Sequence, residues 1–204
     1  MMAEGCEAEA LARALRGDEA GQRQIYQAYH AAAYRLAHLL LRDGMDAEEV
    51  VQDAFVYAFR HLDRYDPGRA AFWTWLRVIL VSRCRNKRRG KRLSRVSLDV
   101  LNAVGRMPAD AGPTNDPGLA VERFDTRREV YRALQQVSPG ARDALVLRYY
   151  EGMPYAEMAE ILGCSSDAAR SRVAHGKSQL RRLLLAGKGS SATEHRAVRP
   201  AEAR

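Results

Sequence analysis

The stretch from residue 72 to residue 92 joins an aromatic, apolar half to a strongly basic half. Seven of the ten residues from 83 to 92 are Lys or Arg, and none is acidic. A packed domain cannot bury that much like charge, so these side chains face either water or a polyanion. A helix dipole favours one or two cations, whereas seven repel one another, so a nucleic-acid backbone is the favoured partner. The apolar side chains recur at helical spacing and can be buried on one face: Phe72, Trp75, Leu76, Ile79, Leu80 and Cys84.

Composition limits the class of protein. A chain of 204 residues favours one large or two small domains, and its 47% hydrophobic content is enough for real cores. The apolar runs are too short to span a membrane, and the acidic start does not resemble a signal peptide. Cys6, Cys84 and Cys164 have neither CxxC nor Cys/His spacing. We therefore expect reduced thiols in a cytoplasmic protein, with no metal site, disulfide or cofactor.

The first half of the chain is predicted to be helical. Residues 8–16 and 19–41 each have an apolar stripe, and Gly44 is placed to cap the second helix. Asp46 is a good N-cap for a third helix, and Glu49 completes a capping-box pattern. This third helix has an apolar stripe of Val50, Val51, Ala54, Phe55, Ala58 and Phe59. Taken alone, its acidic outer face is typical of a solvated first turn, and it comprises Glu48, Glu49, Gln52 and Asp53.

The periodic pattern stops between residues 93 and 125, where Pro and Gly are frequent, so a flexible linker is predicted there. A second helical domain is expected over residues 126–186, with one helix at 127–137 and another opened by Ser138 and Pro139. Residues 187–204 are rich in Gly, Ser, Ala and mixed charge without periodicity, which predicts a disordered tail. The fold class is therefore all-α, with an N-terminal segment at 1–20 and a first domain at 21–92.

Residues 155–173 are predicted to form a helix-turn-helix. Gly163 supplies the tight turn, and Ser165 or Ser166 caps the second helix. Apolar contacts between the two helices are assigned to Met158, Ile161, Leu162, Ala169 and Val173. The alternative is an ordinary helical hairpin, but the basic second helix favours a unit that enters a major groove. The side chains left available for that groove are Arg170, Ser171, Arg172, His175 and Lys177.

In this order and spacing, three motifs resemble those of bacterial sigma factors, specifically the extracytoplasmic-function (ECF) group of the sigma-70 family. Residues 46–55 resemble the polymerase-binding helix of region two, and residues 72–92 resemble the helix that melts and reads the −10 element. Residues 155–184 resemble the region-four helix-turn-helix that reads the −35 element. The resemblance covers about residues 21–92 and 126–185. It implies three kinds of partner: core RNA polymerase through its β′ clamp helices and β flap, promoter DNA, and an anti-sigma factor.

The resemblance also implies roles for particular residues. The outer face of the 46–55 helix, with Glu48, Glu49, Gln52 and Asp53, would dock on the β′ clamp helices. The loop 65–70 would help to hold a flipped base, while Ser82 stands where many members have Asn, which leaves the −10 base preference open. The expected −10 set is Tyr65, Arg69, Trp73, Trp75, Arg77, Ser82, Arg85, Asn86, Arg88 and Arg89. The expected −35 set is Ser166, Ala168, Arg170, Ser171, Arg172, His175 and Lys177.

Two other classes of function compete with this interpretation. A free-standing helix-turn-helix regulator would bind duplex DNA without polymerase, but the basic helix with its Trp73 and Trp75, suited to stacking on unpaired bases, argues against it. A nucleic-acid enzyme such as a metal-dependent nuclease would need clustered carboxylates on a basic surface, whereas the acids of this sequence lie on a different surface or in the linker. No GxxxxGK[ST] phosphate loop is present either. We therefore expect a protein that acts by binding and is not an enzyme.

Overall fold

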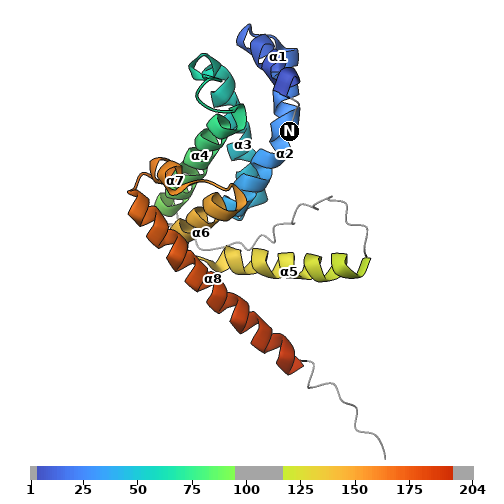
Figure 1. The fold of residues 1–204 in the computed structure, drawn as a ribbon, viewed down its shortest axis with the longest axis vertical. Helices are drawn as coiled ribbons and strands as arrows, with labels where there is room; N and C mark the ends of the chain where they lie inside the picture. Colours follow the sequence, from blue (N-terminus) through green and yellow to red (C-terminus); the bar gives the residue numbers. More distant parts are fainter. Residues whose placement is uncertain (1–3, 95–116, 195–204) are drawn as a thin grey trace, which may run out of the picture. The chain divides into compact units, whose positions relative to one another are not determined.

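The computed structural model describes residues 4–94 and 117–194, with side chains described for 5–90 and 127–186. All regular elements in these ranges are helices, and the chain divides into two compact units, Met1–Pro108 and Ala109–Arg204. The all-α prediction with two helical domains is therefore confirmed (Figure 1). Most of the predicted linker, residues 95–116, and the end of the predicted tail, residues 195–204, lie outside the described residues.

Four α-helices and one short 3-10 helix build the first unit: α1 (Glu4–Leu15), α2 (Glu19–Leu41), α3 (Gly44–Arg60), η1 (Leu62–Arg64) and α4 (Phe72–Ser94). Helix α2 is central, because it packs against α1, α3 and α4 (Figure 1). The apolar stripes of these helices meet in one core that includes Ile25, Leu36, Leu40, Val51, Phe55, Leu76 and Leu80. Three residues of the predicted stripes on α3 and α4 are only half-buried: Phe59, Trp75 and Ile79.

Helix α1 is an integral part of the first unit. Gly21 of α2 is buried so closely beneath it that a Cβ atom there would lie 2.7 Å from the carbonyl oxygen of Ala10. Farther along α2, the hydroxyl of the buried Tyr29 donates a hydrogen bond of 2.7 Å to Oε2 of Glu7. Burial is the main cause that raises the pKa of Tyr29 well above its ordinary value, and the Glu7 carboxylate adds to it. The hydroxyl therefore stays protonated and anchors α1.

The turn between α2 and α3 differs from the sequence prediction. Arg42, at a φ of 70°, ends α2, and its N–H donates to the carbonyl of His38 at 3.0 Å. Asp43 is the N-cap of α3, since its Oδ1 accepts a 3.0 Å hydrogen bond from the N–H of Asp46. The predicted cap at Gly44 and the predicted N-cap at Asp46 are both wrong. An Asp three residues earlier serves equally well as a cap, and it shifts the helix start so that Gly44 lies inside α3.

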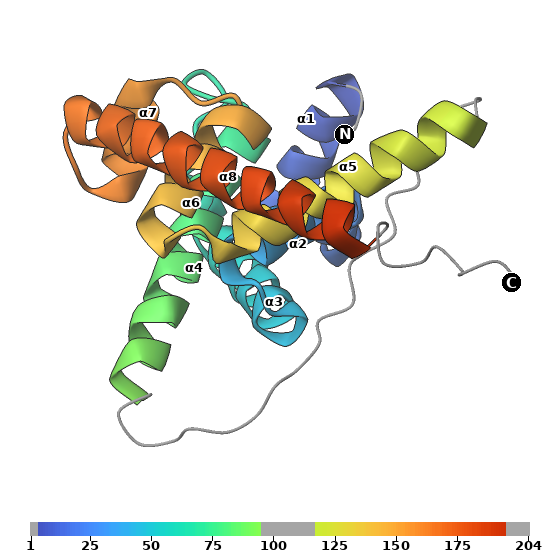
Figure 2. The same cartoon turned by 90° about the horizontal axis from the view of Figure 1, so that it is seen from below.

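The second unit is organised by its last helix. It comprises α5 (Pro117–Gln136), α6 (Pro139–Leu145), the π-helical segment η2 (Val146–Tyr150), α7 (Tyr155–Leu162) and α8 (Ser166–Glu194). Helix α8 packs against α5, α6 and α7 (Figure 2). The core of this unit includes Ala141, Ala144, Leu145, Leu147, Met153, Met158, Leu162 and Val173.

Two helices of the second unit are longer than predicted. Helix α5 begins at Pro117, inside the segment assigned to the linker, because proline is compatible with the first turn of a helix. Helix α8 continues to Glu194, beyond the predicted start of the tail at Gly187. No proline lies between Ser166 and Pro200, so no residue in this segment removes a backbone N–H that the helix needs. Ser138 occupies the predicted N-cap position of α6, yet its hydroxyl makes no capping hydrogen bond.

Candidate functional site

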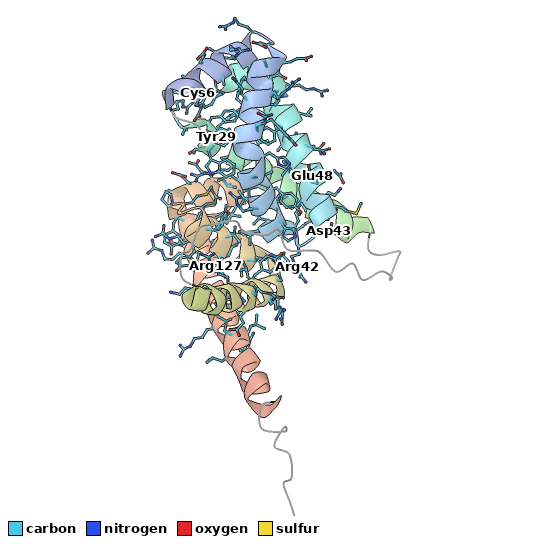
Figure 3. All side chains as sticks on the ribbon, turned by 90° about the vertical axis from the view of Figure 1, so that its right-hand side faces the viewer. Cys6, Tyr29, Arg42, Asp43, Glu48 and Arg127 are labelled. Atoms are coloured by element: carbon cyan, nitrogen blue, oxygen red, sulfur yellow. The ribbon has the colours of Figure 1, made fainter. Side chains whose placement is uncertain are left out.

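The acidic side chains of α3 form an exposed face of the first unit. Glu49, Gln52 and Asp53 are exposed, while the opposite face of α3 lies in the core. Glu48, labelled on α3 in Figure 3, is half-buried, and its Oε1 lies 3.3 Å from Nε2 of His30. The same carboxylate oxygen accepts a 3.4 Å hydrogen bond from Gln52. The structure thus leaves three of the four predicted residues exposed and holds the fourth against α2.

One cation of the basic run turns toward this acidic face. Lys87 of α4 forms an ion pair with Glu49, and its Nζ lies 3.9 Å from Oδ1 of Asp46. The hydrogen bond to Glu49 is the main cause that raises the pKa of Lys87 above its ordinary value. Sequence reasoning missed this residue, because nothing in a run of seven cations marks which side chains turn toward neighbouring helices.

The described part of α4 also carries two arginines that contact the rest of the fold and a stripe of exposed side chains. Nη1 of Arg88 donates a 3.1 Å hydrogen bond to the carbonyl of Leu40 in the last turn of α2, and the guanidinium of Arg83 lies over the ring of Tyr57 at 4.8 Å. These arginines therefore stabilise the fold. An exposed stripe on α4 follows one helical face and consists of Val78, Ser82, Asn86 and Arg89. Of the other predicted residues on α4, Arg77 and Arg85 are half-buried.

The two tryptophans at the start of α4, Trp73 and Trp75, are half-buried in the first unit. The ring of Trp73 stacks on Tyr29, labelled in Figure 3, with centroids 6.0 Å apart and an interplanar angle of 7°. Trp75 packs against Tyr65 with centroids 5.5 Å apart. The Tyr65 hydroxyl donates to the carbonyl of Ala70 at 3.1 Å, which ties the loop 65–70 together. Burial is the main cause that raises the pKa of Tyr65. Each tryptophan therefore packs against the unit on one side and keeps part of its surface in solvent.

The helix-turn-helix has the predicted local chemistry. Gly163 ends α7 in the left-handed conformation, with a φ of 58°. The Oγ of Ser165 accepts a 3.2 Å hydrogen bond from the N–H of Ala168 and so caps α8. Met158, Leu162, Ala169 and Val173 are buried between the helices, whereas Ile161 is half-buried.

The predicted −35 residues lie along the first turns of α8. Ala168 and Arg172 are half-buried. Two of the exposed residues have partners, since the guanidinium of Arg170 lies 5.1 Å from the ring centroid of Tyr155 and Nε2 of His175 lies 2.7 Å from Nε2 of Gln179. The exposed side chains of the set are Ser166, Arg170, Ser171, His175 and Lys177.

Among the described residues, no three His, Cys, Asp or Glu side chains gather in a way that could hold a metal ion. Within the same part of the chain, no helix is both long and apolar enough to cross a bilayer.

Comparisons with known proteins agree with this arrangement. The family model for sigma-70 region 2 matches residues 25–93, and the model for sigma-70 region 4 matches residues 127–180. The ECF RNA polymerase sigma factor SigM of Mycobacterium tuberculosis is 33% identical, over 89% of this chain and 86% of SigM. RNA polymerase sigma factor CarQ of Myxococcus xanthus is 35% identical, over 71% of this chain and 78% of CarQ.

Among solved structures, CnrH in complex with the cytosolic domain of CnrY has a TM-score of 0.57 and 25% identity, covering 89% of this chain and 98% of CnrH. The matched segments correspond to the two helical units, and among the described residues helix α1, the turn after it and the first residues of α2 precede the region 2 match. The chain therefore belongs to the ECF group of RNA polymerase sigma factors.

Proposed function

We propose that the acidic face of α3 binds core RNA polymerase while the exposed stripe of α4 and the start of α8 bind the −10 and −35 elements of a promoter. One observation supports this most directly. The first unit presents exposed carboxylates on α3 and an exposed stripe ending in Arg89 on α4, so one compact unit offers an acidic surface that suits a protein partner and a second surface that suits DNA. The polymerase surfaces would be the β′ clamp helices and the β flap.

The proposed mechanism is binding without covalent chemistry. The α4 surface would hold the backbone of a melted strand, with the accessible parts of Trp73 and Trp75 available for stacking. The start of α8 would read base edges of duplex DNA in the major groove. A factor of this kind acts in the cytoplasm, where polymerase and chromosome are. CnrH was solved with a second protein, the cytosolic domain of CnrY. We also propose that this chain has a protein partner of that kind, an anti-sigma factor.

Transcription from a promoter library, with core polymerase and either the protein or buffer, tests the proposed function. Promoter-specific transcripts that need both the protein and core polymerase are expected. Tight, specific duplex binding by the protein alone, with no change when core polymerase is added, would instead identify a free-standing regulator.

The combined change Gln52→Ala and Asp53→Arg tests the polymerase-binding face. Both side chains are exposed on α3, so folding should change by no more than roughly 0.5 kcal/mol per site. Affinity for core polymerase, measured by direct titration, should fall because one carboxylate becomes a cation. Asp63→Arg makes the same charge change at an exposed site on η1 and is the matched control. Equal affinities for the two variants would show that this face does not bind polymerase.

A further inference from the structure

Two arginines from different elements share one aromatic ring in the second unit. The guanidinium carbon of Arg148, in η2, lies 4.9 Å from the ring centroid of Tyr155, the first residue of α7. The guanidinium carbon of Arg170, in the second turn of α8, lies 5.1 Å from the same centroid. Both distances are within the range of a cation–π interaction.

Arg148, at one end of this cluster, is hydrogen-bonded to the backbone. Nη1 of Arg148 donates a 2.8 Å hydrogen bond to the carbonyl of Met153, whose side chain is fully buried. The N–H of Met153 in turn donates to the carbonyl of Leu147 at 3.0 Å. Arg148 and Tyr155 are both half-buried, whereas Arg170 is exposed. The cluster therefore extends from the hydrogen-bonded segment around Arg148 to the solvent-exposed guanidinium of Arg170.

An exposed arginine normally samples many rotamers, and ordering it on a ligand reduces affinity. The π-face of Tyr155 attracts the Arg170 guanidinium and restricts it before DNA arrives. The guanidinium of Arg148 lies over the same ring, so the ring is itself held in place. We propose that Tyr155 is a positioning residue that pre-organises Arg170 for promoter DNA, a role that rests on the proposed DNA-binding function of Arg170.

Three variants test this role: Tyr155→Phe, Tyr155→Leu and Arg170→Ala. Phe keeps the aromatic face, so its affinity for duplex DNA with the preferred −35 sequence should match that of the original protein. Leu removes the aromatic face, and affinity should fall about two- to five-fold, the equivalent of one exposed cation–π contact. Tyr149→Leu, at a tyrosine that is 61% exposed on the neighbouring segment, is the matched control and should bind as before.

The double variant Tyr155→Leu with Arg170→Ala separates positioning from a general structural effect. If Tyr155 acts through Arg170, the double variant should bind as weakly as Arg170→Ala alone. Tyr155→Leu should also weaken the sequence preference at the same base pair at which Arg170→Ala abolishes it. Equal, additive losses on every −35 sequence would overturn the proposal.

Fluorinated phenylalanines at position 155 provide a test that does not require the Tyr155→Leu variant to fold. Each keeps the shape of the ring and weakens its negative face. Affinity should decline as fluorine atoms are added, and a flat series would contradict the proposal. A loss in Tyr155→Phe as large as in Tyr155→Leu would show that the hydroxyl contacts DNA directly, which also overturns it. If Arg170→Ala itself binds normally, the proposed function of Arg170 fails, and that result is distinct from a failure of Tyr155 alone.

Discussion

Replacing Gly176 with Val is expected to destabilise the second unit by roughly 3 kcal/mol and to abolish binding to −35 DNA at moderate temperature. Gly176 is buried where α8 crosses α6, and a Cβ atom there would lie 2.8 Å from Cγ of Leu145 and 3.1 Å from the carbonyl oxygen of Ala141. Leu145 is itself buried, and the carbonyl belongs to the backbone of α6, so neither can move without displacing the helix. The better helix propensity of Val recovers only a few tenths of a kcal/mol.

Hydrogen exchange measured element by element checks this expectation. Amides of α6 and α8 should lose protection while those of α2 and α3 keep it, because the two units have separate cores. Gly140→Val is the matched control in the same unit, since a Cβ atom at Gly140 meets nothing within 4 Å. Unchanged protection in α6 and α8 of the Gly176 variant would show that the α6–α8 contact tolerates a side chain.

Arg88→Ala and Arg89→Ala are expected to have different effects although the residues are adjacent. Arg88→Ala removes a charged hydrogen bond to the carbonyl of Leu40, so the first unit should lose about 1.5–3 kcal/mol. Arg89 is exposed on α4, and Arg89→Ala should leave stability within roughly 0.5 kcal/mol. If Arg89 contacts a phosphate, the slope of log K against log salt for promoter binding should fall by about one.

Denaturant unfolding of both variants and salt-titrated binding with core polymerase make this comparison. Arg88→Lys is a further control, because it keeps the charge but lacks the guanidinium fork that reaches the carbonyl of Leu40. Equal stability of the Arg88→Ala and Arg89→Ala variants would contradict the structural role of Arg88. Sequence alone treats the two arginines as one phosphate-binding pair, whereas the structure gives them separate roles.

The parts of the fold that depend on local pattern could be predicted. Helix α2 begins at Glu19 and ends at Leu41 as expected, because a long apolar stripe defines it. The turn at Gly163 and the cap at Ser165 also follow from local chemistry. The start of α3 could not be fixed in the same way, since Asp43 and Asp46 are both good caps and only the packed turn selects between them.

The sequence could not predict which way each cationic side chain points, because that depends on groups far away in the sequence. Arg88 meets a carbonyl of α2, and Lys87 meets a carboxylate of α3. Helical spacing places both residues on α4 but says nothing about which neighbour each one meets. Tyr155 was missed for a similar reason, since its two arginine partners come from segments on either side of it in the chain.

The ion pair between Lys87 and Glu49 joins α4 to the acidic face of α3. One ammonium group cannot neutralise Glu49 and a DNA phosphate with full strength at the same time. A protein that binds the Glu49 carboxylate would leave the Lys87 ammonium free to bind a DNA phosphate. Conversely, a phosphate that binds Lys87 would leave Glu49 free to bind the protein. Thermodynamic linkage makes this exchange reciprocal: any gain in DNA affinity caused by polymerase equals the gain in polymerase affinity caused by DNA. If polymerase binds through Glu49 and DNA binds through Lys87, the two ligands of the first unit would therefore bind cooperatively.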